Sequence, residues 1–254
     1  MDQDGFTLVV HRQRSSNKRS HIKNQKKTNA NIAAHHSADK EKLLNSTLEL
    51  PANFQLLIDS QVNVIRSVIF YKNFIDHIKP SIEEFKGPST ELDCVCYGLG
   101  SISDSKLAQF QFALLIIMIQ ELKFNRVYLF EPMLTQAESK FISLQGISII
   151  SENENGERKV HQKTLFYMPH CPIMLYNNVI KSNWDTGQYT KLAIIGNSFE
   201  TYDLNSMGTS LGDKCPFIQS ALTQGIVTET LFVDFEPLSH AFNNTALIQF
   251  KSFK

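Results

Sequence analysis

Apolar residues follow two different periods along the chain. Between Lys40 and Phe85 they recur at intervals of three and four, which predicts helices, with Pro51 separating two of them and Pro80 limiting a third. From residue 93 onward, short apolar runs typical of buried strands alternate with helical patterns. The predicted strands are Asp93–Tyr97, Arg126–Phe130, Ser148–Ile150, Thr164–Met168, Lys191–Ile195, Ile226–Phe235 and Leu247–Phe250.

Helical patterns fill most intervals between these strands. They are expected over Ser103–Leu122, Gln136–Leu144 and Met174–Ser182, with Ser103 and Thr135 as N-caps of the first two. Strands that alternate with helices indicate a mostly parallel sheet with helices on both faces. The sequence therefore predicts an α/β fold, a Rossmann-like three-layer domain preceded by an N-terminal helical lead-in.

Composition divides the chain into three parts. Residues 1–40 are polar and basic and are expected to form a disordered arm, 41–86 the helical lead-in packed on the body, and 87–254 the Rossmann-type domain. The whole chain has 25 basic and 25 acidic residues, yet residues 5–38 carry seven Lys and Arg and no Asp or Glu. The arm is either a solvated tail or a segment for nuclear import or nucleic-acid contact, with weak contact expected from residues 11–27.

Cysteine usage and hydropathy favour a soluble protein of a reducing compartment. The four cysteines follow no secretory signal pattern, and Cys94 and Cys96 are spaced to share one strand face as packed thiols. The longest wholly apolar stretch, Phe112–Ile119, is far shorter than the roughly 20 residues of a membrane span. We expect no membrane contact and a cytoplasmic location, with the nucleus open as a second one.

The first predicted strand runs into two glycines spaced by one residue. Gly98 and Gly100 let the backbone turn tightly, and the helix that follows would point its first N–H groups at a bound ligand. Ser103 stands where a full dinucleotide fingerprint has a third glycine, and Glu131 ends the second strand where an acid would bind ribose hydroxyls. The alternative is that the glycines serve only the turn.

Other polar residues are expected beyond the carboxyl ends of the strands. The candidate cofactor-binding set is Gly98, Gly100, Ser101, Glu131, Asn197 and Ser198, with S-adenosylmethionine or a nucleotide as ligand. Asn177, Asn178, Asn183 and Trp184 form a polar and aromatic group that would join them in one crevice. Capping and turn roles for each of these residues are the alternative.

The loop after the fourth strand, Pro169–Pro172, falls beside the glycine turn. His170 would be a general base and Cys171 a nucleophile that it activates. Neighbouring residues usually point apart, so the alternative is a histidine that orders the loop beside a packed thiol.

Ordered motifs between Gly87 and Phe250 resemble those of the sensitivity-to-red-light-reduced (SRR1-like) family. The motifs are Cys96-Tyr97-Gly98-Leu99-Gly100-Ser101, Phe130-Glu131-Pro132, Leu165–Cys171, Leu175-Tyr176-Asn177-Asn178, Ser182-Asn183-Trp184, Ile194–Phe199 and Phe242-Asn243-Asn244-Thr245. The resemblance implies a role in circadian-clock input and in regulation of haem biosynthesis, through regulatory protein partners not yet identified. It supplies no catalytic residue set. Glu131 stands where many relatives have Asp, which preserves the carboxylate.

Cysteine precedes proline twice, at Cys171 and Cys215. Such pairs recur in haem-responsive segments, where the thiolate ligates iron, so both cysteines are candidate haem ligands. The dipeptides also occur by chance. No other metal site is predicted.

Two classes of function follow. The first is a regulator without a reaction of its own, which acts through a ligand- or partner-binding crevice. The alternative is a methyltransferase-like or nucleotide-using enzyme with its site at the Gly98–Gly100 turn, and the sequence leaves the question of catalysis open while favouring the regulator.

Overall fold

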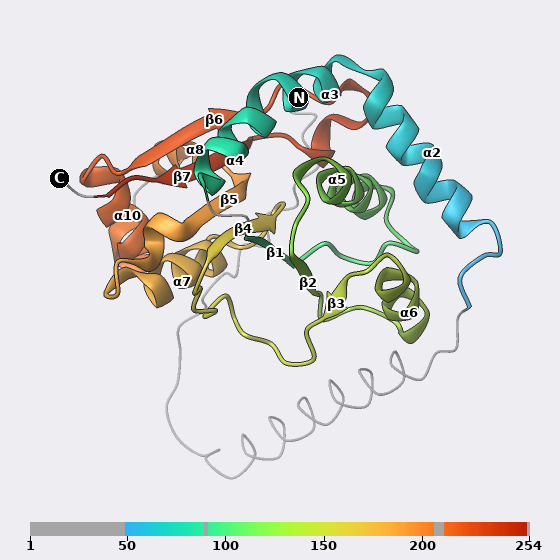
Figure 1. The fold of residues 1–254 in the computed structure, drawn as a ribbon, viewed down its shortest axis with the longest axis horizontal. Helices are drawn as coiled ribbons and strands as arrows, with labels where there is room; N and C mark the ends of the chain where they lie inside the picture. The colour runs from blue at the N-terminus through green and yellow to red at the C-terminus, as the bar shows by residue number, and fades with distance from the viewer. Residues whose placement is uncertain (1–48, 89–90, 206–210, 253–254) are drawn as a thin grey trace, which may run out of the picture. The chain divides into compact units, whose positions relative to one another are not determined.

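A seven-stranded sheet forms the centre of the computed structural model, which describes residues 49–88, 91–205 and 211–252 (Figure 1). The strands lie in the order β3-β2-β1-β4-β5-β7-β6. Their bounds are β1 Leu92–Tyr97, β2 Arg126–Phe130, β3 Ser148–Ile149, β4 Lys163–Met168, β5 Leu192–Asn197, β6 Val227–Leu231 and β7 Thr245–Phe250. The first five strands are parallel and β7 is antiparallel to both of its neighbours, so the predicted mostly parallel α/β sheet is confirmed.

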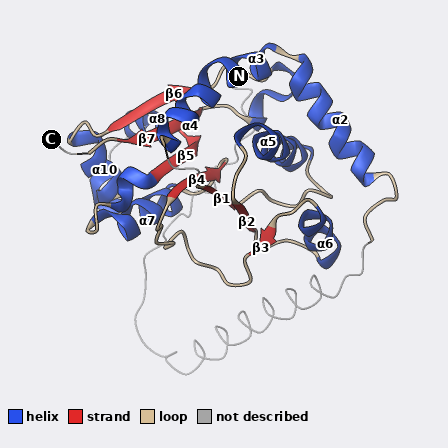
Figure 2. Cartoon of the chain, in the orientation of Figure 1, coloured by secondary structure: helices blue, strands red, loops and turns tan. Residues whose placement is uncertain are grey.

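Helices cover both faces of the sheet (Figure 2). Those of the first face are α2 Phe54–Ser67, α3 Ile69–Asn73, the π-helix η1 Phe74–Ile78, α4 Lys79–Lys86, α5 Lys106–Leu122 and α6 Gln136–Leu144. The second face carries α7 Ile173–Trp184 and α10 Pro216–Thr223. Shorter elements are η2 Gln188–Lys191, α8 Phe199–Asn205, α9 Leu211–Lys214 and η3 Glu236–Ala241.

Strand side chains alternate between two separate apolar cores. Cys94 and Cys96 of β1 point into the core beneath α5, whereas Val95 and Tyr97 point into the core beneath α7. The two cysteines therefore share a strand face and are buried, as their spacing predicts.

The N-terminal helices pack against α5. On α5, Glu121 accepts hydrogen bonds from Tyr71 at 3.1 Å and from Lys79 at 3.0 Å, and Gln120 accepts one from Arg66 at 2.7 Å. Phe70 stacks on Phe242 with ring centroids 4.9 Å apart. These helices thus complete the core on the α5 face.

The helix after β1 begins later than predicted. Its N-cap is Ser105, whose hydroxyl accepts from the Ala108 N–H at 3.2 Å, and Ser103 is not the cap. The Ser103 N–H instead donates to Glu138 at 2.8 Å, which holds this residue in the preceding turn.

Other predicted boundaries were also wrong. The strand predicted over Ile226–Phe235 is β6 Val227–Leu231, and Phe235 precedes η3 instead. Pro80 is the second residue of α4 rather than the limit of a helix, because a proline is tolerated in the first helical turn. Pro80 has no backbone N–H to donate, and the segment directly before α4, Phe74–Ile78, is wound as a π-helix. In the sheet, the strand predicted to end at Ile195 extends to Asn197, because Gly196 and Asn197 pair with β7.

Several expectations concern residues outside the described ranges. The basic arm over residues 1–40, with the nucleic-acid contact expected from residues 11–27, lies there, as does the start of the helical lead-in. Among the described residues, no helix has the length and apolar character needed to cross a membrane.

Candidate functional site

The turn after β1 requires both of its glycines. Gly98 has a φ of 70° and Gly100 a φ of 79°, values that other residues rarely adopt. The Gly98 N–H donates to the Phe130 carbonyl at 3.1 Å, which ties the turn to β2. A Cβ atom on Gly98 would lie 2.7 Å from Cys171 Sγ, so the glycine also lets the β4 loop approach.

Glu131 holds this turn from the end of β2. Its Oε2 accepts from the Gly100 N–H at 2.8 Å, and its Oε1 accepts from the Met133 N–H at 2.9 Å. The carboxylate that was predicted to bind a ribose is therefore adjacent to the glycine turn, as expected, and is hydrogen-bonded to the backbone of the turn.

Glu138 holds the same turn from α6, and the sequence interpretation missed it. This buried carboxylate accepts from the Ser101 hydroxyl and the Ser103 N–H at 2.8 Å each, and from the Thr135 N–H at 2.9 Å. Burial raises its pKa, but the hydrogen bonds from Thr135, Ser103 and Ser101 outweigh burial and hold the pKa below its ordinary value. Thr135 and Glu138 also form the capping box of α6, and the T-x-x-E spacing was the available signal.

The two carboxylates change what the turn can bind. An open glycine turn offers its N–H groups to a phosphate, but here the N–H groups of Gly100 and Ser103 already donate to carboxylates. A phosphate would have to displace them and would be repelled by their charge. The turn therefore suits a neutral or cationic ligand.

The β4 loop places His170 and Cys171 against different partners. His170 has a φ of 54°, its N–H donates to Asn197 Oδ1 at 2.9 Å, and its Nε2 lies 3.2 Å from the Ala241 carbonyl. The Cys171 thiol donates to the Tyr97 carbonyl at 3.3 Å. Burial and the charge of Glu131 raise the pKa of Cys171 to about 12, so the thiol is protonated at neutral pH.

Asn197 and Ser198 bind protein groups at the end of β5. The Asn197 N–H donates to the Tyr176 hydroxyl at 3.1 Å, and that hydroxyl donates in turn to the Met168 carbonyl. Ser198 accepts from the Thr201 N–H at 3.2 Å and donates to Glu229. Asn197 therefore joins the β4 loop to β5, while the buried Ser198 stabilises the start of α8.

The side-chain amides of α7 do not join this crevice. Asn177 Oδ1 accepts from the Phe217 N–H at 3.0 Å and so caps α10. Asn183 Oδ1 accepts from the Val160 N–H at 2.9 Å, and Trp184 stacks on Tyr189 with ring centroids 5.1 Å apart. Asn177 thus has the capping role of the alternative, whereas Asn183 binds backbone groups of Arg158 and Val160 in the loop before β4.

The second candidate haem ligand lies in the core beneath α7. Cys215 is fully buried, its Sγ lies 3.7 Å from Met174 Sδ, and burial raises its pKa. Haem ligation by Cys171 or Cys215 stays a prediction, and it requires both deprotonation and exposure of the thiol. No group of three or more His, Cys, Asp or Glu side chains suited to a metal occurs within the described ranges.

A buried glutamine next to His170 was also missed by the sequence interpretation. The Gln111 side-chain amide donates to the Ala241 carbonyl at 3.2 Å, the same carbonyl that His170 contacts. Gln111 Oε1 is buried and has no hydrogen-bond partner among the residues that the structure describes. A buried acceptor of this kind is usually satisfied by water or by a ligand. A polar position inside the apolar run 110–119 was the only signal.

Comparison with known proteins agrees with the sequence motifs. A family model described as the SRR1 domain matches residues 74–249. Protein SENSITIVITY TO RED LIGHT REDUCED 1 of Arabidopsis thaliana is 33% identical over 159 residues, which cover 60% of this chain and 58% of that protein. An SRR1-like protein of Mus musculus is 34% identical over 141 residues, which cover 54% of this chain and 57% of that protein. The match thus spans less than two thirds of each relative.

A solved structure, that of LepI in complex with SAH and a substrate analogue, aligns with 67% of this chain and 46% of its own. The sequence identity is 12% and the TM-score is 0.37. The family model, by contrast, matches more than half of the chain, in the segments that carry the glycine turn and the β4 loop. The chain belongs to the SRR1 family.

Proposed function

We propose that this chain is a regulatory protein of light and clock signalling that binds a small ligand or a protein partner between the Gly98 turn and the His170 loop. The name of the Arabidopsis relative, which refers to reduced sensitivity to red light, supports a signalling role. The motifs shared with the family support clock input and regulation of haem biosynthesis. The location that we propose is the cytoplasm, and the basic residues between positions 5 and 38 favour the nucleus as a second one.

One observation carries the proposal. Strands β1 and β4 are neighbours, and the chain leaves them in opposite directions, toward β2 and toward β5. Ligands of open α/β sheets bind beyond the carboxyl ends of the strands at this reversal point. The Gly98 turn and the His170 loop meet there, and Gly98 is exposed while His170 and Asn197 are half-buried.

The state of the nucleophile candidate supports regulation over catalysis. A cysteine nucleophile reacts as the thiolate and needs a base within hydrogen-bond reach. Cys171 is buried, its pKa is raised to about 12, and its thiol donates to a backbone carbonyl. His170 contacts a different carbonyl, that of Ala241.

A second candidate is supported by the two carboxylates at the turn. S-adenosylmethionine carries a sulfonium cation, and the negative charge of Glu131 and Glu138 favours a cation over the phosphates of a nucleotide. A methyltransferase-like enzyme is therefore the alternative function, ahead of a nucleotide-using one.

Thermal shift of the full chain with S-adenosylmethionine, nicotinamide dinucleotide, ATP or haem tests the ligand. A ligand at about 100 times its Kd stabilises by about 2.7 kcal/mol, which raises the melting temperature by several degrees. We expect the shift with S-adenosylmethionine and its loss in His170→Gly, because glycine keeps the left-handed backbone but removes the imidazole. Lys123→Gly is the matched control, since Lys123 also has a positive φ, at the far end of α5.

The outcomes separate the two candidates. A shift that persists in His170→Gly would place the ligand elsewhere, and no shift with any of the four compounds would overturn the small-ligand form of the proposal. Release of S-adenosylhomocysteine with a substrate present would establish the enzyme. In cells that lack their own SRR1-family protein, the wild-type chain should restore the clock period and His170→Gly should not.

A further inference from the structure

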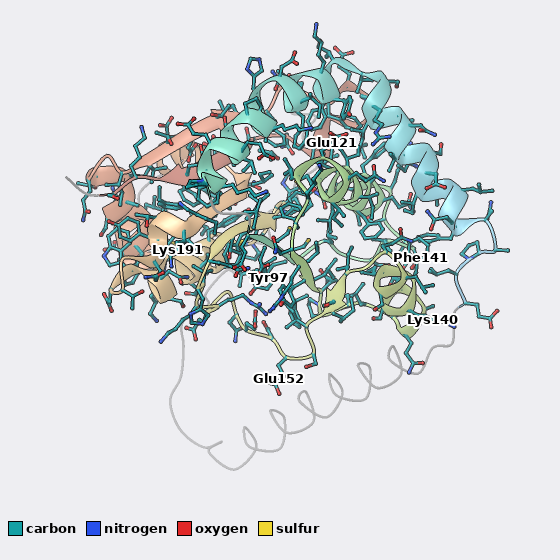
Figure 3. All side chains as sticks on the ribbon, viewed as in Figure 1. Tyr97, Glu121, Lys140, Phe141, Glu152 and Lys191 are labelled. Atoms are coloured by element: carbon teal, nitrogen blue, oxygen red, sulfur yellow. The ribbon has the colours of Figure 1, made fainter. Side chains whose placement is uncertain are left out.

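The crossover from β3 to β4 contains no helix. Residues 150–162 run instead as a loop that passes below β2 and β1 in Figure 1. Glu154 holds this loop to the sheet by accepting from the Tyr97 hydroxyl of β1. Within the loop, Arg158 donates to Glu154 twice, at 2.9 and 2.7 Å, and its guanidinium lies over the Tyr128 ring of β2. Figure 3 shows Tyr97 above the loop segment that carries Glu152. A loop leaves more of the sheet face open than a helix would.

A cavity of about 270 Å³ lies between the end of this loop and the first residues of three strands. Its walls include Asp93 of β1, Arg126 and Tyr128 of β2, and Lys159 and His161 of the loop. The strand register places Asp93 opposite Arg126 on one side and opposite Thr164 on the other. The cavity therefore lies at the amino ends of the parallel strands, whereas the glycine turn lies at their carboxyl ends.

Asp93 contributes a buried hydrogen-bond acceptor that has no donor among the described residues. Its Oδ1 is buried and has no hydrogen-bond partner within the described part of the chain. Burial raises its pKa, although a hydrogen bond from Gln162 and the charge of Arg126 act in the opposite direction. Leaving a buried carboxylate oxygen unpaired is unfavourable, and a donor group from a bound molecule would remove the penalty.

Two cations and an imidazole lie in the cavity wall near this acceptor. Arg126, Lys159 and His161 are exposed at the cavity, and the half-buried Arg158 is committed to Glu154. The cavity wall itself thus has two full positive charges and the one carboxylate of Asp93, while Glu91, which acts on both Asp93 and Arg126, is not part of the wall. The side chains of the wall therefore suit an anion. Val95 and Val160 add an apolar floor.

We propose that this cavity binds a small hydroxylated anion, in which a phosphate or carboxylate contacts Arg126 and Lys159 and a hydroxyl donates to Asp93. The volume lies just below the roughly 300–1,000 Å³ of ligand pockets, which limits the occupant to a few carbon atoms. A dinucleotide would not fit. This site is separate from the one at the Gly98 turn and does not depend on it.

Calorimetric titration of the full chain tests the assignment. Glycerol 3-phosphate and glycerate distinguish a phosphate from a carboxylate, while inorganic phosphate and glycerol each carry half of the required chemistry. We expect saturable binding of one of the first two, and binding at least about tenfold weaker for both fragments. Arg126→Gln and Asp93→Ala should each weaken the complete ligand by at least about tenfold.

Two controls make the result specific. Lys140→Gln removes an exposed cation of α6, a helix of the other sheet face that contributes nothing to the cavity wall, and should bind as the wild type does (Lys140 is labelled in Figure 3). His170→Gly should also bind normally, because His170 lies at the other end of the strands. Arg126 is exposed, so Arg126→Gln keeps the test valid even if Asp93→Ala unfolds.

Three results would overturn the proposal. Neither glycerol 3-phosphate nor glycerate saturates the protein at millimolar concentration, or inorganic phosphate or glycerol binds as tightly as the better of these two ligands, or Arg126→Gln retains wild-type affinity. Equally tight binding of inorganic phosphate would remove the role of Asp93, and equally tight binding of glycerol or retained affinity in Arg126→Gln would remove the anion contact.

Discussion

Glu138 satisfies backbone and hydroxyl donors of two segments at once. Its carboxylate accepts from Ser101 and Ser103 in the glycine turn and from Thr135 at the start of α6. A local capping box needs only the last of these contacts. The contacts with Ser101 and Ser103 also link the glycine turn to α6, so loss of the Glu138 carboxylate should destabilise both the turn and the helix.

We predict that Glu138→Ala lowers the free energy of unfolding by about 2–3 kcal/mol, because charged hydrogen bonds and a helix cap are lost together. Urea unfolding measures the change. Glu121→Gln is the control, since Glu121 is a half-exposed carboxylate of a surface ion-pair network and should cost less than about 1 kcal/mol. An equal loss in both variants would show that Glu138 acts only as a surface charge does.

The same residue predicts a pH dependence. The folded pKa of Glu138 is lowered from 4.5, so its stabilising contribution is complete above the unfolded pKa and is lost as the pH falls through the folded value. The difference between wild type and Glu138→Gln should therefore be largest near neutral pH and shrink below pH 4.5. Unfolding curves at a series of pH values check this, and a difference that grows on acidification contradicts it.

At the scale of elements, the β1–α5 turn and the β4–α7 loop are packed against each other through Gly98 and Cys171. A methyl group on Gly98 would lie 2.7 Å from Cys171 Sγ, whereas one on Gly100 would lie 3.8 Å from Ala108 Cβ. We predict that Gly98→Ala costs about 2–4 kcal/mol, from a left-handed φ plus overpacking, and Gly100→Ala only about 1–2 kcal/mol from φ.

A double-mutant cycle separates the two terms. Cys171→Ala should recover the overpacking part in the Gly98→Ala background and nothing in the Gly100→Ala background. Chemical denaturation of the six proteins gives the coupling. Additive effects of Gly98→Ala and Cys171→Ala on the free energy of unfolding would mean that the added methyl group has no steric conflict with the Cys171 side chain.

Element types were readable from the sequence because each depends on local pattern. Strand β2 and helix α6 lie over the predicted residues, with Thr135 as the cap. Ser103 and Ser105 are equally good caps by local chemistry, and only the contact of Ser103 with Glu138, 35 positions away, decides between them. The role of Gln111 could not be predicted from local sequence either, because its partner, the Ala241 carbonyl, is 130 positions distant. Candidate residues could be found from the sequence, but not what they contact.

At the scale of the whole molecule, the helices before residue 74 complete the core of a domain whose family match begins at Phe74. Phe54, Ile58 and Ile65 of α2 and Phe70 of α3 are all buried in the α5-side core. Burying four such side chains contributes roughly 6–12 kcal/mol before entropy is counted, as much as the net stability of a typical domain. A chain that begins at Phe74 should therefore lose its cooperative melting transition, while one that begins at Glu49 should keep it. Scanning calorimetry of the two truncated chains distinguishes these outcomes. Cooperative melting of the chain that begins at Phe74 would mean that α2 and α3 are not required for a stable core.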